Sequence, residues 1–282
     1  MKTLPEPVFG AREVLDSCAG SIRDAGLSAR LRQVAPTMEA AEEKYRCLAP
    51  ESRLFEIAAT TSVDGIVTAA DMSTLYKGTF SRSGSRNRHF YDRLKLAAPN
   101  GICPLCGQRA VKTLDHYLPK AQHPSFAVTP LNLVPACSDC NKLKLDRVAE
   151  SMADQTLHPY YDDVSDAAWL AAEVMEANIP AVTFSACPSV QWDAMKRQRL
   201  LAHFRTFGLG ELYAVQASVE MVNIRYALSE VAQSGGADGV KVFLLLQARS
   251  RTKADANSWN AALYRALSQS AWFCNVGFTQ LG

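Results

Sequence analysis

The chain has 282 residues, of which 48% are hydrophobic and 21% are charged, and its formal net charge is +2. With 15 glycines and 13 prolines it is neither collagen-like nor of low complexity, and its apolar fraction is too high for a disordered protein. The strongly apolar segment at residues 240–246 contains Lys241 and is far shorter than the roughly 18 residues of a membrane helix, so we expect no membrane span.

The first ten residues lack the continuous apolar run of a secretory signal, because proline and glutamate interrupt them. We therefore expect the protein in the reducing cytoplasm, where cysteines are thiols or metal ligands rather than disulfides. The positions of the eight cysteines then matter more than their number.

The first predicted elements are helical. Apolar residues at helical spacing predict two or three short helices between residues 11 and 60. Thr68 followed by Asp71 is typical of the capped start of another helix. Residues 81–86 are rich in arginine, serine and glycine and predict an exposed basic loop, and residues 90–96 predict a further helix.

The middle of the chain is irregular. From residue 101 to 141, prolines and glycines divide it into short extended pieces, with one helix start after the last cysteine pair. Helical spacing then returns and predicts helices at residues 167–177, 192–204, 212–231, 240–248 and 259–272. A Ser-Gly-Gly sequence at 234–236 is expected to separate the third of these from the fourth.

The small net charge conceals a basic middle segment. Residues 77–147 carry 12 lysines and arginines against 4 aspartates and glutamates, whereas acidic residues outnumber basic ones by three in each flanking segment. Such an excess suits a polyanionic partner such as nucleic acid, although a solvated face with scattered counter-ions gives the same count.

Two C-x-x-C pairs predict a metal site. Cys103 with Cys106 and Cys137 with Cys140 are separated by 30 residues, and Gly107 after the first pair provides the permissive backbone that such turns favour. Four thiolates complete a tetrahedral zinc site without a water ligand, so we expect structural zinc rather than redox pairs. Because a closed zinc site is structural, any chemistry must come from other residues.

The residues enclosed by the two pairs carry a family resemblance. Asp115 and His116 lie on an expected short strand, Asn132 precedes the second pair, and Asn141 directly follows the last cysteine. In this order the motif resembles the HNH endonuclease superfamily. The four-cysteine version is similar to endonuclease VII-like Holliday-junction resolvases and to the HNH subunits of Septu-type anti-phage systems.

The resemblance implies a fold and a division of the chain. We expect a mainly α protein with a small zinc-stabilised ββα-metal (HNH) motif inserted between helical regions. The expected parts are a helical N-terminal region with the basic segment (1–96), the HNH nuclease module (97–160) and a helical C-terminal region (161–282).

Phosphodiester hydrolysis needs an activated water and stabilisation of charge on the phosphate and leaving oxygen. A histidine that is neutral near pH 7 can act as the general base, and His116 is placed for that role. Mg²⁺ or Mn²⁺ prefers oxygen ligands, which Asp115 and Asn141 would supply. The resemblance gives Asn132 a structural role, in which its side chain ties the loop that holds His116.

Some of these residues have simpler interpretations. Asn141 could cap the helix that begins there, and a lone histidine is usually a satisfied polar residue. Neighbouring strand residues point to opposite faces, so Asp115 and His116 serve one site only where the strand ends or twists. His158, beyond the motif, is either a further ligand or phosphate contact or an ordinary loop histidine.

Three lysines are candidate phosphate contacts, namely Lys120, Lys142 and Lys144. Lys144 also stands where some HNH relatives carry an acidic residue. A third protein ligand for the catalytic metal is therefore left open.

The hypothesis is a metal-dependent HNH endonuclease that cuts DNA, with RNA left open as a substrate. It would act as the nuclease of an anti-phage system beside an ATPase partner, and its helical flanks would dock that partner or restrain the nuclease. Two alternatives remain, namely a non-catalytic zinc module that binds nucleic acid or scaffolds a complex, and a structure-selective junction resolvase. The oligomeric state is not predicted.

Overall fold

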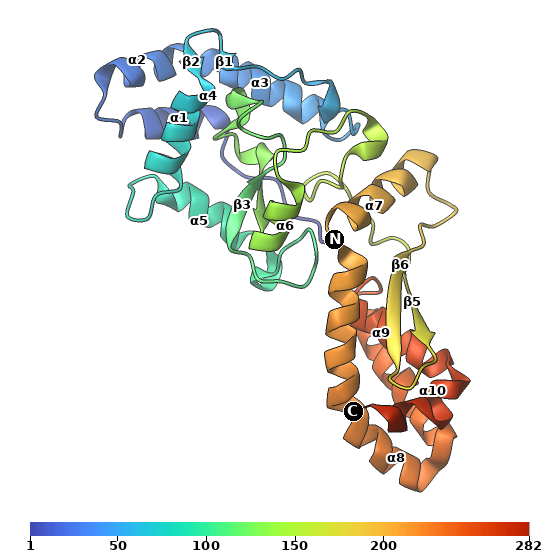
Figure 1. Ribbon diagram of the computed structural model, residues 1–282. Helices are drawn as coiled ribbons and strands as arrows, with labels where there is room; N and C mark the ends of the chain where they lie inside the picture. Colours follow the sequence, from blue (N-terminus) through green and yellow to red (C-terminus); the bar gives the residue numbers. More distant parts are fainter. Residues whose placement is uncertain (282) are drawn as a thin grey trace. The chain divides into compact units, whose positions relative to one another are not determined.

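A computed structural model describes residues 1–281 of the chain (Figure 1). This part is mainly helical, with small antiparallel two-stranded sheets. It divides into two compact units, of which the first spans Met1–Asp163 and the second begins at Val164. The boundary that we predict after residue 96 lies inside the first unit. Within residues 1–281, no helix combines the length and apolarity needed to span a bilayer.

The first unit consists of helices and two short hairpins. Its α-helices are α1 (Ala11–Ala19), α2 (Ala25–Gln33), α3 (Ala35–Leu48), α4 (Ala69–Leu75), α5 (Arg88–Leu96) and α6 (Ser138–Lys144). Its strands are β1 (Ser62–Val63), β2 (Val67–Thr68), β3 (Thr113–His116) and β4 (Leu133–Ala136). The short helices predicted between residues 11 and 60 are thus α1, α2 and α3.

Side chains that accept backbone N–H groups fix the starts of these helices. Glu42 of α3 accepts the N–H of Ala11 at 2.8 Å and so caps α1 from a distant part of the chain. Thr68 and Asp71 form a reciprocal capping box at the start of α4, which confirms the prediction from that pair. Both contacts satisfy donors that the first turn of a helix leaves open.

The chain continues from α4 into one π-helical turn, Tyr76–Phe80. Such turns shift side chains out of the α-helical register and occur frequently at functional sites. This one buries Phe80 in the core and brings the ring of Tyr76 to 4.7 Å from the ring of His116, measured between centroids.

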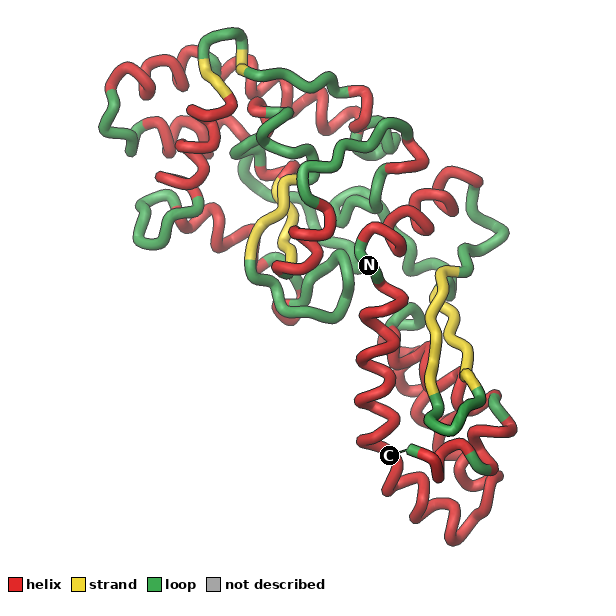
Figure 2. The backbone as a smooth tube through the Cα atoms, in the orientation of Figure 1, coloured by secondary structure: helices red, strands yellow, loops and turns green. Residues whose placement is uncertain are grey.

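Strands β3 and β4 form an antiparallel hairpin, in which Asp115 is opposite Val134 and His116 is opposite Leu133. The chain between the strands is mostly loop (Figure 2). Helix α6 follows β4 almost directly and packs against β3. Residues 113–144 therefore run strand, strand, helix.

One hydrophobic core joins this hairpin to the N-terminal helices. Leu114 of β3 and Leu133 of β4 are buried in the same cluster as residues of α1 to α5. Burying a leucine side chain contributes about 1.5–3 kcal/mol relative to leaving it exposed. The hairpin is thus held by apolar packing in addition to any metal.

The second unit contains one hairpin and further helices. Its elements are β5 (Leu170–Met175), β6 (Ala181–Ala186), α7 (Ala194–Thr206), α8 (Leu209–Ala254), α9 (Trp259–Gln269) and α10 (Ala271–Asn275). Helices α8 and α9 pack along each other, β5 packs on α9, and β6 packs on α8.

The prediction of a helix at residues 167–177 is wrong, because this segment contains strand β5. The strand pairs antiparallel with β6 along its whole length. An apolar pattern this short fits either a helical or a strand period. Whether the segment forms a helix or a strand therefore depends on whether another segment pairs with it. In β6, buried Val182 and Phe184 alternate with exposed Thr183, and this period of two is the signal that the prediction overlooked.

Helix α8 is interrupted at Gly236, as the sequence predicts for residues 234–236. Gly236 has φ 57° and ψ −153°, which is not helical and which only glycine adopts without strain. The single helix predicted at 259–272 is likewise divided. Ser270 ends α9 and caps α10 by accepting the N–H of Phe273 at 3.0 Å.

Candidate functional site

Four buried cysteines form a compact cluster. The Sγ atoms of Cys103, Cys106, Cys137 and Cys140 all lie within 4.8 Å of one another. None of the cysteines in residues 1–281 is in a disulfide. Zinc bound tetrahedrally at about 2.3 Å from each sulfur separates the sulfurs by about 3.8 Å. The cluster therefore has the size and the donor set of a zinc site.

Both C-x-x-C pairs lie on turns that direct backbone N–H groups at sulfur. After the first pair, Gly107 takes φ +64° and the N–H of Arg109 lies 3.5 Å from Cys106 Sγ. In the second pair, Cys137 Sγ accepts the N–H of Cys140 at 3.3 Å and serves as the N-cap of α6. Donors placed in this way favour the thiolate form of a cysteine.

The pKa values of the four thiols shift in opposite directions, because the thiols donate hydrogen bonds to one another. A hydrogen bond from Cys103 lowers the pKa of Cys106 to about 7, and the corresponding contacts raise the pKa of Cys103 and of Cys140. Four thiolates this close repel one another, and a divalent cation would supply the positive charge that offsets the repulsion. With four sulfur ligands, such a site has no open position for water.

Asp115 and His116 are the last two residues of β3, and both are buried. Strand pairing ends at His116, so the alternation of faces does not continue beyond it. The charges of Lys120 and Lys144 act on the pKa of both residues. Asp115 and His116 therefore share one electrostatic environment.

The hydrogen bond of His116 defines its tautomer. Its Nε2 lies 2.9 Å from the carbonyl oxygen of Ala127, and because a carbonyl only accepts, Nε2 carries the hydrogen. Nδ1 has no hydrogen-bond partner within residues 1–281. Burial, with the nearby Lys120 charge, lowers the pKa of His116 to about 3. The imidazole is thus neutral at pH 7, and its Nδ1 carries the free lone pair.

Asp115 is paired with Lys144. The Nζ of Lys144 lies 3.2 Å from Asp115 Oδ2 and donates to the backbone oxygen of His116 at 2.7 Å. Asp115 and Lys144 are only 5% and 6% exposed. Burial raises the pKa of Asp115, and the Lys144 charge opposes that rise. The predicted phosphate contact Lys144 therefore bonds inside the protein, while Asp115 Oδ1 has no polar partner among the described residues.

Asn132 is fully buried and ties together the loop between β3 and β4. Its Oδ1 accepts the N–H of Leu118 at 2.7 Å, and its Nδ2 donates to the oxygens of Leu118 and Phe126 at 2.9 and 3.2 Å. Phe126 precedes Ala127, whose carbonyl binds His116. Asn132 thus acts on His116 through the loop and not by direct contact.

Asn141 lies within α6 and not at its start. The N-cap of α6 is Cys137, so the interpretation of Asn141 as a helix cap is wrong. The Asn141 side chain is half-buried and has no hydrogen-bond partner among the described residues. Its amide oxygen is therefore available to a ligand one helical turn before Lys144.

His158 lies apart in a cluster of tyrosines. Its Nε2 is 2.9 Å from Tyr45 Oη, its Nδ1 accepts the N–H of Tyr160 at 3.2 Å, and its ring stacks on Tyr117 with centroids 4.3 Å apart. Both ring nitrogens are engaged by protein groups, so we do not include His158 among the proposed ligands.

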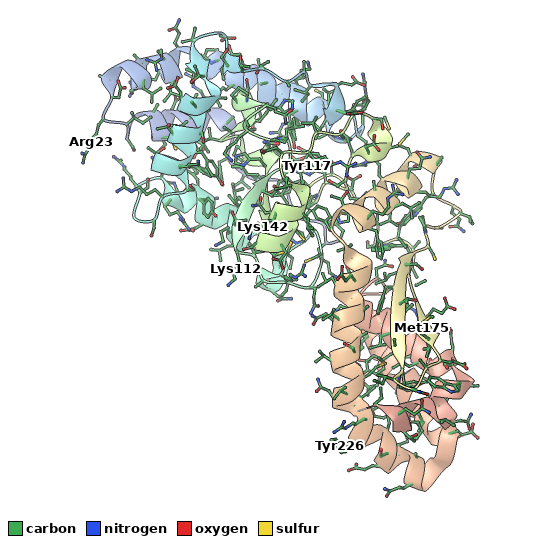
Figure 3. The ribbon with its side chains drawn as sticks, in the orientation of Figure 1. Arg23, Lys112, Tyr117, Lys142, Met175 and Tyr226 are labelled. Carbon is green, nitrogen blue, oxygen red and sulfur yellow. The ribbon has the colours of Figure 1, made fainter. Side chains whose placement is uncertain are left out.

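The other two candidate lysines, Lys120 and Lys142, are more exposed than Lys144. Lys142 is exposed on α6, and Lys112 just before β3 is also exposed (Figure 3). The Nζ of Lys120 lies 5.6 Å from the centroid of the Tyr76 ring, within the range of a cation–π contact. The Tyr76 ring therefore lies beside both Lys120 and the tilted ring of His116 at the end of β3.

Sequence reasoning missed two groups of this site. Tyr76 belongs to a π-helical turn about 40 residues away along the chain, and no local pattern signals such a turn. The carbonyl of Ala127 is a backbone group, which any residue type would supply. The only indirect signal was Asn132, because a buried asparagine in a loop normally binds backbone groups.

Comparison with known proteins finds a relative in a phage. The chain is 28% identical, over an alignment of 294 residues, to protein ea31 of Escherichia phage lambda, and the alignment covers 97% of this chain and 99% of ea31. No family model matches the chain, and no solved structure matches it. The similarity extends over both units, so ea31 is similar to the whole chain and not only to the cysteine cluster.

Proposed function

We propose that the chain is a metal-dependent endonuclease of the HNH type that hydrolyses phosphodiester bonds in DNA. The observation that carries this proposal is His116, a buried neutral imidazole with Nε2 fixed by the Ala127 carbonyl and with Nδ1 unprotonated. A base that receives a proton from water needs that nitrogen open.

In the proposed reaction, His116 Nδ1 accepts a proton from the water that attacks phosphorus, and the 3′ oxygen leaves. Asp115 Oδ1 and the Asn141 amide oxygen would hold Mg²⁺ or Mn²⁺, which when bound stabilises charge on the phosphate and on the leaving oxygen. Asn132 positions His116 through the loop. The four cysteines would hold structural zinc.

Nucleic acid as the substrate is supported by the charges near this site. Lys77, Lys112 and Lys142 are exposed, and all three belong to the basic middle segment. Exposed lysines bind phosphates as point charges without reading sequence. We therefore propose that these lysines, together with Lys120, contact the phosphate backbone of the nucleic acid.

We further propose that the protein is the nuclease of an anti-phage system and works beside an ATPase partner. The support is the resemblance of residues 103–141 to the HNH subunits of Septu-type systems. An open reading frame next to this gene that encodes a Gly-rich phosphate-binding loop would support the partner, and purification of the two proteins as one complex would test it.

The central test is plasmid cleavage by the purified, zinc-loaded chain, with its partner present, in Mg²⁺ or Mn²⁺. We expect nicking or linearisation, and we expect His116→Ala to reduce the rate by about two to four orders of magnitude while zinc content is unchanged. His89→Ala, at an exposed histidine outside the site, is the matched control and should keep full activity.

The same cleavage assay identifies the preferred substrate and the metal that supports cleavage. Four-way junctions and single-stranded RNA are compared with linear duplex, and a strong preference for junctions would identify a resolvase. If wild-type protein cuts none of these nucleic acids with any metal or partner, the proposal is wrong.

A second candidate is a non-catalytic zinc module that binds nucleic acid. The observation that favours it is the pairing of Asp115 with Lys144, which neutralises the carboxylate proposed as the metal ligand. This module would bind DNA with an affinity that falls steeply with salt and that His116→Ala leaves unchanged.

A further inference from the structure

The ammonium group of Lys144 lies where Asp115 would bind a cation. It is 3.2 Å from Asp115 Oδ2 and 2.7 Å from the backbone oxygen of His116, and it lies over the Tyr117 ring at 5.9 Å from the centroid. A buried ammonium with three such neighbours is held in one place and does not move freely between protein and solvent.

An ammonium and a divalent ion compete for one carboxylate. Lys144 is part of the chain, so its local concentration at Asp115 is high whatever the concentration of the free ion. A divalent ion at Asp115 Oδ1 would also be repelled by the Lys144 ammonium group beside Oδ2, because solvent screens charges poorly in the buried interior. Both effects weaken the binding of a free divalent ion.

The wider neighbourhood also favours anions over cations. The ionised groups that act on Asp115 or on Lys120 are Asp146, Lys77 and Lys144. Together these five residues comprise three ammonium groups and two carboxylates. A phosphodiester would bring the negative charge and the oxygen ligands that a divalent ion lacks at this site.

We propose that Lys144 withholds Asp115 from free divalent ions, so that the metal binds this site only together with a nucleic-acid phosphate. The inference rests on the proposed function and assigns a regulation to the same site. Metal and nucleic acid then enhance each other's binding by the same factor, as thermodynamic linkage requires. Without nucleic acid the site therefore remains without its catalytic ion.

The test measures Mn²⁺ binding by calorimetry to the zinc-loaded full chain, first alone and then with a short DNA duplex that carries phosphorothioate linkages. We expect Lys144→Met, which keeps an unbranched apolar stem and removes the ammonium group, to bind Mn²⁺ about tenfold or more tightly than wild type without DNA. DNA should raise the Mn²⁺ affinity of wild type by a similar factor and that of Lys144→Met by less.

Matched variants separate charge from shape. Lys144→Arg keeps the charge and should bind Mn²⁺ as weakly as wild type. Lys44→Met, at an exposed lysine of α3 outside the proposed site, should behave as wild type. Adding Asp115→Asn to Lys144→Met should abolish the gain. Equal Mn²⁺ affinity of wild type and Lys144→Met, or a gain that survives Asp115→Asn, would overturn the proposal.

Folding is monitored by zinc content and by thermal unfolding, and Mn²⁺ should raise the Tm of Lys144→Met more than that of wild type. If Lys144→Met does not fold, Lys144→Gln repeats the test with an uncharged donor for the His116 oxygen. The outcome is independent of cleavage. A tenfold gain in a protein that cuts nothing supports this inference and rejects the nuclease, whereas cleavage without any gain does the reverse.

Discussion

At the scale of single residues, Asn132 determines how the loop between β3 and β4 is closed. Its side chain satisfies the N–H and the oxygen of Leu118 and also the oxygen of Phe126, all away from water. The next residue, Ala127, accepts the hydrogen of His116 Nε2. The tautomer of the candidate base thus depends on a residue that does not touch it.

Asn132→Ala should therefore destabilise the first unit and impair the site together. Loss of three hydrogen bonds leaves backbone groups buried without partners, and we expect the free energy of unfolding to fall by about 2–4 kcal/mol. Urea unfolding measures this, with Asn223→Ala at an exposed position of α8 as the control. A loss below about 0.5 kcal/mol would show that water replaces the side chain.

A comparison of Lys144 with the cysteines shows how far single residues can be read from sequence. The four cysteines that cluster were predictable, because a metal imposes its spacing on the chain. The partner of Lys144 was not, because a lysine at the end of a helix is exposed in most proteins and burial is decided by tertiary packing. The alternative interpretation of Asn141 as a cap is wrong for a similar reason, since the sulfur of Cys137 already caps α6.

At the scale of elements, α6 depends on the cysteine cluster. Cys137 and Cys140 lie in its cap and first turn, and Asn141 and Lys144 follow on the same short helix. A helix of 7 residues is too short to be stable by itself. A metal bound by the cysteines would place both side chains together with the packing of α6 on β3.

Removal of zinc should accordingly loosen this part of the unit and spare the rest. Cys137→Ser, or treatment with a strong chelator, should abolish the protection of backbone amides in residues 133–144 from hydrogen exchange. Helices α1 and α3 should remain protected, because their core contains no cysteine of the cluster. Cys47→Ser, at an exposed cysteine, is the control. Equal loss in α1 and α3 would mean that the metal supports the whole unit.

Elements were predictable where local signals dominate. The capping pair at Thr68 and the glycine break at 236 are decided by the residues themselves, and both were found. The pairing of β5 with β6 is decided by contacts between segments, and a pattern read within one segment misses it. Single-segment reasoning therefore fails mainly in the second unit.

At the scale of the whole molecule, the division at residue 163 separates all the candidate chemistry from the second unit. The cysteine cluster, β3 and α6 share the first unit with five helices and one hydrophobic core. That unit has the size at which single domains fold alone.

Residues 1–163, expressed alone, should therefore fold, bind zinc and unfold cooperatively. We expect one zinc per chain by atomic emission and a single thermal transition. The full-length chain is the reference for both measurements. A fragment that is unfolded or zinc-free would show that the first unit needs the second for its stability.

Cys137 serves both as a zinc ligand candidate and as the cap of α6, which links the site to the redox state of its surroundings. A disulfide requires two sulfurs at about 2.05 Å, so oxidation within the cluster would draw two ligands together and release the metal. A Cys137 sulfur drawn toward another cysteine would move away from the N–H of Cys140 that it accepts. Oxidative stress would then unwind the first turn of α6 and displace Asn141 and Lys144, which would inactivate the site without any change at His116.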